Sequence, residues 1–164
     1  MRAAEVVKIA LKSTQENLHM YLADVTDAEL TVRPVPGANN IAWQLAHLCT
    51  AEGFLLGDQL PGVKYPEVPA AIASLGSDRT GKVDPPGGYA SKAQYLECFD
   101  SLRAATIAAV DKIADADLDR PTTNMMAKYA PKLADLLLLT ANHTLMHGGQ
   151  FTVGRRALNK PVVF

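Results

Sequence analysis

Four segments of this chain carry apolar residues at the three- and four-residue spacing of an amphipathic helix, and this pattern limits the possible folds more than any other feature. The segments run from about 3 to 23, 40 to 56, 91 to 114 and 131 to 158. No run of alternating apolar and polar residues competes with them, and the sequence contains no internal repeat. The simplest fold for four such helices is an all-α four-helix bundle.

Local signals mark where these helices begin. Thr26–Glu29 and Ser91–Gln94 both match the capping box, in which a hydroxyl and a side chain three residues later satisfy free backbone N–H groups. Asn39 or Asn40 can cap the second long helix, and Pro131 suits the first turn of the last one. We therefore expect a short capped turn between the first two long helices.

A long connection separates the second and third helices. Residues 57–90 hold five of the ten prolines and six of the eleven glycines, with at most one short helical piece in 69–75. Connections of this length are uncommon in compact domains and are usually functional lids or linkers. We expect a lid or a crossover that packs over one end of the bundle.

Length and composition limit the class of protein. A chain of 164 residues fits one domain spanning 1–164. The 16 Lys and Arg residues against 17 Asp and Glu give a net charge of −1 without a basic run, which argues against nucleic-acid binding. No apolar stretch approaches the roughly 20 residues that span a bilayer. The sequence thus predicts a soluble domain without a nucleic-acid or membrane partner.

The N-terminus and the cysteines indicate a cytoplasmic location. Charged residues among the first twelve interrupt any apolar core of a secretory signal. Cys49 and Cys98 lie on different predicted helices and lack zinc-type spacing, so we expect small buried apolar residues in a reduced compartment.

Two of the four histidines stand four residues apart on the last predicted helix. This spacing places His143 and His147 on one face, in a stripe shared with Leu136 and Leu139 that should point into the bundle. Buried imidazoles without partners are costly. By itself, the pair is explained equally well by core histidines that hydrogen-bond to backbone or hydroxyl groups.

His47 strengthens the interpretation as a metal site. It lies in an apolar stretch of a different helix, and three histidines from two helices would supply three nitrogen ligands while leaving coordination positions free. Glu52, five residues further, is a candidate for an acid–base or supporting role, with a surface charge as the alternative. His19 could lie at the surface, in the core or in the wall of the site.

Two segments resemble the signature segments of the DinB/YfiT-like family of metalloenzymes. They are Asn40-Ile41-Ala42-Trp43-Gln44-Leu45-Ala46-His47-Leu48 and His143-Thr144-Leu145-Met146-His147-Gly148-Gly149-Gln150. The resemblance implies an up-down-down-up bundle and a homodimer. It also implies one divalent transition-metal ion, nickel, zinc or iron, held by His47, His143 and His147.

The resemblance also suggests activities on a small-molecule substrate. The first hypothesis is a metal-dependent transferase that moves the sulfur of a low-molecular-weight thiol onto a small electrophile. The alternatives are a metal-dependent hydrolase of a small ester or amide, and a non-catalytic metal-binding stress protein. A plain interaction bundle with three core histidines would need no metal.

Overall fold

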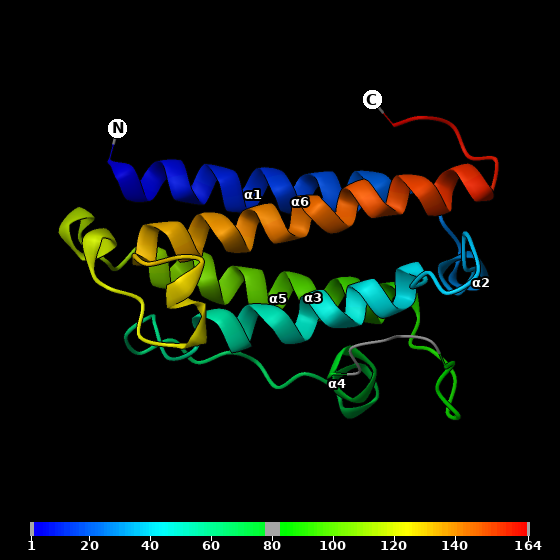
Figure 1. Ribbon diagram of the computed structural model, residues 1–164, viewed down its shortest axis with the longest axis horizontal. Helices are drawn as coiled ribbons and strands as arrows, with labels where there is room; N and C mark the ends of the chain where they lie inside the picture. Colours follow the sequence, from blue (N-terminus) through cyan, green and yellow to red (C-terminus); the bar gives the residue numbers. More distant parts are fainter. Residues whose placement is uncertain (1, 78–82, 164) are drawn as a thin grey trace.

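The computed structural model describes residues 2–77 and 83–163, and these residues form an all-α fold (Figure 1). They contain no β-strand, only an isolated bridge between Pro121 and Lys132. In chain order the helices are α1 (Ala3–Leu22), α2 (Asp27–Leu30), α3 (Ile41–Leu56), α4 (Ala70–Ser77), α5 (Lys92–Val110) and α6 (Leu133–Ala157). Two 3₁₀ turns, η1 (Asp115–Asp119) and η2 (Met125–Lys128), lie between α5 and α6.

The four long helices form an up-down-down-up bundle. In Figure 1, α1 and α6 run in one direction and lie side by side, while α3 and α5 both run in the other. The expected fold class is therefore confirmed. None of the described helices combines the length and apolar character needed to cross a bilayer.

The caps that the sequence predicts are present, whereas two helix boundaries differ. Thr26 caps α2 and Ser91 caps α5, each through a capping box, and Asn40 rather than Asn39 accepts a hydrogen bond from the Trp43 N–H of α3 at 2.8 Å. α5 ends at Val110, four residues earlier than expected. Pro131 precedes α6 because its carbonyl accepts a hydrogen bond from the Thr122 N–H, at 2.9 Å.

The connection between α3 and α5 crosses along the side of the bundle, not over one end as we expected. Because α3 and α5 run in the same direction, the chain must return over the length of α3, roughly 24 Å at 1.5 Å per residue. The short helix α4 lies on this path (Figure 1). It packs against α3 through buried Ile72 and Leu75.

The core consists of two apolar clusters separated by a polar layer. One cluster joins the end of α1, α2, α4, the first halves of α3 and α5, and Phe151 of α6. The other joins the first turns of α1 and α6 with the last turns of α3 and α5. Each long helix contributes polar side chains to the layer between them, namely Thr14, Glu52, Arg103, Thr106 and Thr144.

Candidate metal centre

Three histidines from two helices converge where α3 lies against α6. His47 comes from α3, and His143 and His147 come from α6. One ligand atom from each lies within 4.8 Å of the other two, and the cluster includes no carboxylate or thiol among the described residues. The residues that the sequence predicts as ligands are thus brought together.

The spacing of the ring nitrogens fits a single metal ion. The Nε2 atoms of His47 and His143 are 3.3 Å apart, and those of His143 and His147 are 3.2 Å apart. With metal–nitrogen bonds of 2.0–2.1 Å, two ligands at tetrahedral angles have nitrogens about 3.3 Å apart. Two of the three nitrogen pairs therefore stand at chelating distance, and the third pair lies within 4.8 Å.

Gln44 orients the ring of His147. The Gln44 side-chain N–H donates to the Asn39 carbonyl at 3.4 Å, so its oxygen is left to accept from Nδ1–H of His147, at 3.1 Å. A proton on Nδ1 leaves Nε2 of the neutral ring with its lone pair directed at the cluster. Such a hydrogen bond to the far nitrogen is the usual way in which proteins fix a metal-binding histidine.

His47 is held from two sides. The Trp43 ring, one turn earlier on α3, stacks on the imidazole with centroids 5.1 Å apart and planes 4° from parallel. Trp43 is itself only 6% exposed and is part of the core. His47 also makes a hydrogen bond with the backbone of Gly76, which brings α4 to the edge of the site.

Gly76 permits this approach of α4. A Cβ atom at position 76 would stand 2.3 Å from the carbonyl oxygen of Ala46 and 2.8 Å from Oγ1 of Thr50. Since both contacts are shorter than real Cβ contacts, only glycine lets α4 lie this close to α3. The docking of α4 and the placement of His47 therefore depend on the same residue.

Burial keeps all three imidazoles neutral at neutral pH. It lowers the pKa of His143 to about 4 and that of His147 to about 3, and in both cases the neighbouring histidines lower it further. Burial also lowers the pKa of His47, although the hydrogen bond with Gly76 opposes the shift. Neutral rings offer the lone pairs that a metal requires.

The histidines lie at the edge of the core. The buried stripe of α6 includes Leu136, Thr140, Thr144 and His147, whereas His143 is only partly buried. The buried face of α6 is therefore rotated slightly from the stripe that the sequence suggested. Thr140 and Thr144 occupy core positions there, because their hydroxyls hydrogen-bond to carbonyls of the preceding turn. This edge position leaves one side of the cluster accessible.

Glu52 lies in the polar layer, and its hydrogen bonds go to residues other than the histidines. Its carboxylate accepts from Nε of Arg103 at 3.0 Å and from the Thr106 hydroxyl at 2.6 Å. At 2% exposure it is not the surface charge that we considered as an alternative. Its suggested acid–base role stays a prediction.

Contacts of α1 explain the positions of His19 and of Gly148. Nε2 of His19 lies 2.8 Å from Asp100, and the ring does not belong to the histidine cluster. Gly148 lets α6 approach the ring of Tyr21, because a Cβ there would stand 3.3 Å from it. A Cβ on Gly149 would meet nothing within 4 Å, so only the first glycine has a packing reason.

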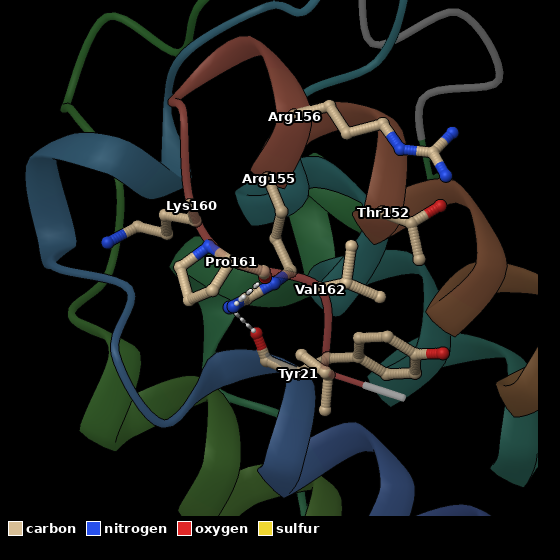
Figure 2. Close-up of a pocket in the computed structure, with 8 residues that line it drawn as sticks. Tyr21, Thr152, Arg155, Arg156, Lys160, Pro161 and Val162 are labelled. Carbon is tan, nitrogen blue, oxygen red and sulfur yellow. Dashed lines mark hydrogen bonds between the residues drawn. The ribbon is translucent and has the colours of Figure 1, made fainter.

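A cavity at the C-terminal end of α6 has a different character. It measures about 160 Å³, and Figure 2 shows Arg155 in its wall donating hydrogen bonds to the carbonyls of Tyr21 and Pro161. Arg155 also pairs with Asp24, and Lys160 pairs with Glu29. Its lining includes none of the three histidines, and two of its cations already have partners.

Sequence reasoning missed Gln44 and Gly76. Gln44 carries a usable signal, since a polar residue one turn before His47 in an otherwise apolar stretch points to the same side of the helix. Gly76 gives no such signal, because it is one of six glycines in the long connection and its partner lies thirty residues earlier in the chain.

Comparison with known proteins agrees with this fold. The DinB superfamily matches residues 10–151. A conserved protein from Enterococcus faecalis superposes with a TM-score of 0.69 at 17% identity, covering 98% of this chain and 99% of that one. YfiT from Bacillus subtilis, described as a probable metal-dependent hydrolase with an unusual four-helix bundle topology, gives 0.68 at 16% identity, covering 96% and 89%. Comparison with curated protein sequences found no match.

Proposed function

The chain belongs to the DinB superfamily, and from this premise we propose that it is a metal-dependent enzyme acting on a small molecule. His47, His143 and His147 hold one divalent transition-metal ion, and the favoured reaction transfers a low-molecular-weight thiol to a small electrophile. Nickel, zinc and iron all suit three imidazole ligands. The observation that carries the proposal is the convergence of three neutral ring nitrogens at chelating distance.

The donor set supports a catalytic rather than a purely structural site. Structural zinc sites are closed by four protein ligands, whereas catalytic sites keep a position for water or substrate. Three histidines converge here without a fourth ligand group in the cluster that the described residues form. An ion in this position supplies a Lewis acid that lowers the pKa of a thiol or water molecule beside it.

The surrounding residues position the ligands and limit access to them. Gln44 holds the tautomer and direction of His147, and Trp43 restrains the His47 ring by stacking. α4 lies along the His47 side, where the backbone of Gly76 completes the hydrogen bonding of that imidazole. A substrate would therefore approach past the partly exposed His143.

Hydrolysis of a small ester or amide is the second candidate. The description of YfiT as a probable metal-dependent hydrolase favours it, and the same open site would serve both reactions. The two candidates differ in the nucleophile that the site admits. In the hydrolase, water takes the place of the thiol.

Metal content tests the proposal first. Elemental analysis of the native protein should give about one equivalent of metal per chain. His143→Ala should weaken binding by more than about 100-fold, because loss of a supporting partner alone costs 10–100-fold. His19→Ala is the matched control, since that histidine pairs with Asp100 outside the cluster. Equal metal content in both variants would refute the three-histidine site.

Turnover then separates the reactions. We expect the metal-loaded protein to consume a small electrophile only when a thiol is present and to yield a conjugate that mass spectrometry detects. Turnover of an ester or amide without thiol would establish the hydrolase instead. One equivalent of metal without any substrate-dependent rate would support the hypothesis of a non-catalytic metal-binding protein.

We also propose that the protein is a homodimer that uses the outer face of α1 and α6. Several large apolar side chains of these helices are exposed there, including Ile9 at 56%, Leu145 at 46% and Met146 at 53%. Burial of such side chains against a second copy would remove apolar surface from water. Light scattering should give twice the mass of the chain, and Met146→Glu should shift it to the monomer.

A further inference from the structure

The two cysteines, which are 49 positions apart in the sequence, face each other between α3 and α5. Sγ of Cys49 lies 3.7 Å from the carbonyl oxygen of Tyr95, one turn before Cys98 on α5. Cys98 lies on the turn of α5 that follows this carbonyl, which places the two thiols beside each other. Neither cysteine forms a disulfide, and both belong to the same apolar cluster. The sequence predicts two buried thiols but not their contact.

The two thiols differ in access. Cys49 is fully buried, whereas Cys98, at 7% exposure, lines a cavity of about 350 Å³ between α5 and the crossover. Glu67, Pro69 and Ile72 of the crossover form the opposite wall of this cavity. A small solute that enters it therefore reaches Cys98 first.

The chemistry of the cavity favours a small neutral oxidant. The neighbouring Cys49 thiol lowers the pKa of Cys98, although burial and the nearby Glu97 oppose the shift, and a larger thiolate fraction increases reactivity. Glu67 and Glu97 both line the cavity, so their negative charge disfavours anionic reagents. Hydrogen peroxide is neutral and no larger than a few water molecules, which suits this cavity.

We propose that Cys98 and Cys49 form a peroxide-reactive dithiol site, in which Cys98 is oxidised through the cavity and Cys49 resolves the product into a disulfide. In the first step the Cys98 sulfur attacks hydrogen peroxide, the O–O bond breaks, and Cys98 becomes a sulfenic acid with release of water. In the second step the Cys49 sulfur displaces the hydroxyl of the sulfenic acid as a second water, and the S–S bond forms. The two thiols lose two electrons and two protons, which peroxide accepts.

The product would cross-link the two parallel helices. A disulfide needs an S–S bond of about 2.05 Å, so the two sulfurs must approach each other before the bond forms. The bond would lie two residues from His47, although its formation does not depend on a metal.

Mass spectrometry tests the proposal on the folded, full-length protein. After treatment with hydrogen peroxide, denaturation and alkylation, we expect the intact mass to fall by two hydrogen atoms with neither cysteine alkylated. Digestion without reductant should give a cross-linked peptide pair containing Cys49 and Cys98, which dithiothreitol separates. Full alkylation of both cysteines, or a cross-link only between chains, would overturn the proposal.

Variants establish the order of the steps. In Cys49→Ala, Cys98 should stop at the sulfenic acid, which dimedone traps, whereas in Cys98→Ala the buried Cys49 should stay reduced. Oxidation of Cys49 at an undiminished rate in Cys98→Ala would contradict entry through the cavity. His143→Ala, which lacks the proposed metal site, should still form the disulfide, and its failure to do so would assign the oxidation to metal chemistry instead. The wild-type mass decides the outcome even if a cysteine variant does not fold.

Discussion

Two polar clusters lie inside the same bundle, and they satisfy their hydrogen-bonding groups in opposite ways. In the polar layer, the Arg103 guanidinium contacts Glu52, the Leu11 carbonyl and the hydroxyls of Thr14 and Thr144, so that all four long helices take part. In the histidine cluster, the Nε2 atoms face one another. The first cluster pairs donors with acceptors of fixed role, whereas each contact in the second joins two identical ring nitrogens and is a hydrogen bond only where one of the two carries the proton.

This difference separates a structural from a functional role. A buried charge is tolerated only when it is paired and hydrogen-bonded, and the 0% exposed Arg103 meets that condition through protein atoms alone. Neutral imidazoles that converge at chelating distance gain a common partner only from outside the chain. Variants that disturb one cluster should therefore affect stability, and variants that disturb the other should affect metal affinity.

The largest expected effect is on the polar layer. Arg103→Ala leaves the Glu52 carboxylate buried without its cation, which should lower the free energy of unfolding by about 3–5 kcal/mol. Urea unfolding measures this loss, and the folded fraction should keep its metal. His143→Ala provides the opposite control, with metal lost and stability reduced by less. Metal loss in folded Arg103→Ala would show that the layer also positions the histidines.

A smaller effect should follow from loosening His147. Gln44→Leu removes the acceptor for Nδ1–H and should weaken metal binding 10–100-fold, or about 1.4–2.8 kcal/mol. Competition with a chelator measures the affinity. The matched control is Gln59→Leu, another buried glutamine whose partner is Thr123. If both variants bind metal equally, Gln44 does not orient the site.

Crowding the contact between α3 and α4 should lower both the stability of the protein and its metal affinity. Gly76→Ala places a methyl group against the Ala46 carbonyl, and overpacking of this kind typically lowers stability by about 1–3 kcal/mol. Because α4 must then move away from His47, metal affinity should fall as well. Gly149→Ala is the control, since it meets no atom and should raise stability by up to about 1 kcal/mol. Calorimetry and metal titration compare the two variants. Equal stability and equal metal affinity in Gly76→Ala and Gly149→Ala would contradict the prediction.

The smallest net effect is expected from replacing both charges of the layer. Glu52→Leu combined with Arg103→Met removes the ion pair without leaving a lone charge, and such exchanges are often neutral or stabilising. Thr14 and Thr144 keep hydrogen bonds to carbonyls of their own helices. Urea unfolding should therefore show that the double variant recovers most of the stability lost in Arg103→Ala. Failure to recover it would mean that the layer stabilises the bundle through its charges.

Much of the fold and the members of the histidine cluster could be predicted because the signals are local. Thr26, Asn40 and Ser91 mark helix starts through bonds that span three residues. The pair His143 and His147 shares a face by helical geometry alone. The end of α5 and the position of Pro131 were predicted wrongly, because long-range hydrogen bonds override local preference there. Asp115 accepts from the N–H groups of Ala3 and Ala4, and the Pro131 carbonyl accepts from the Thr122 N–H.

The sequence by itself determined that the chain forms four amphipathic helices and that His143 and His147 share one face of the last helix, since helical periodicity directs each side chain relative to its neighbours. Only the tertiary structure decided which side chains meet across helices. It placed Gln44 on His147, Gly76 beside His47, Arg103 on Glu52 and Cys49 against Cys98. The reason is that the relative rotation and shift of packed helices depend on the whole set of contacting side chains, which no local pattern contains.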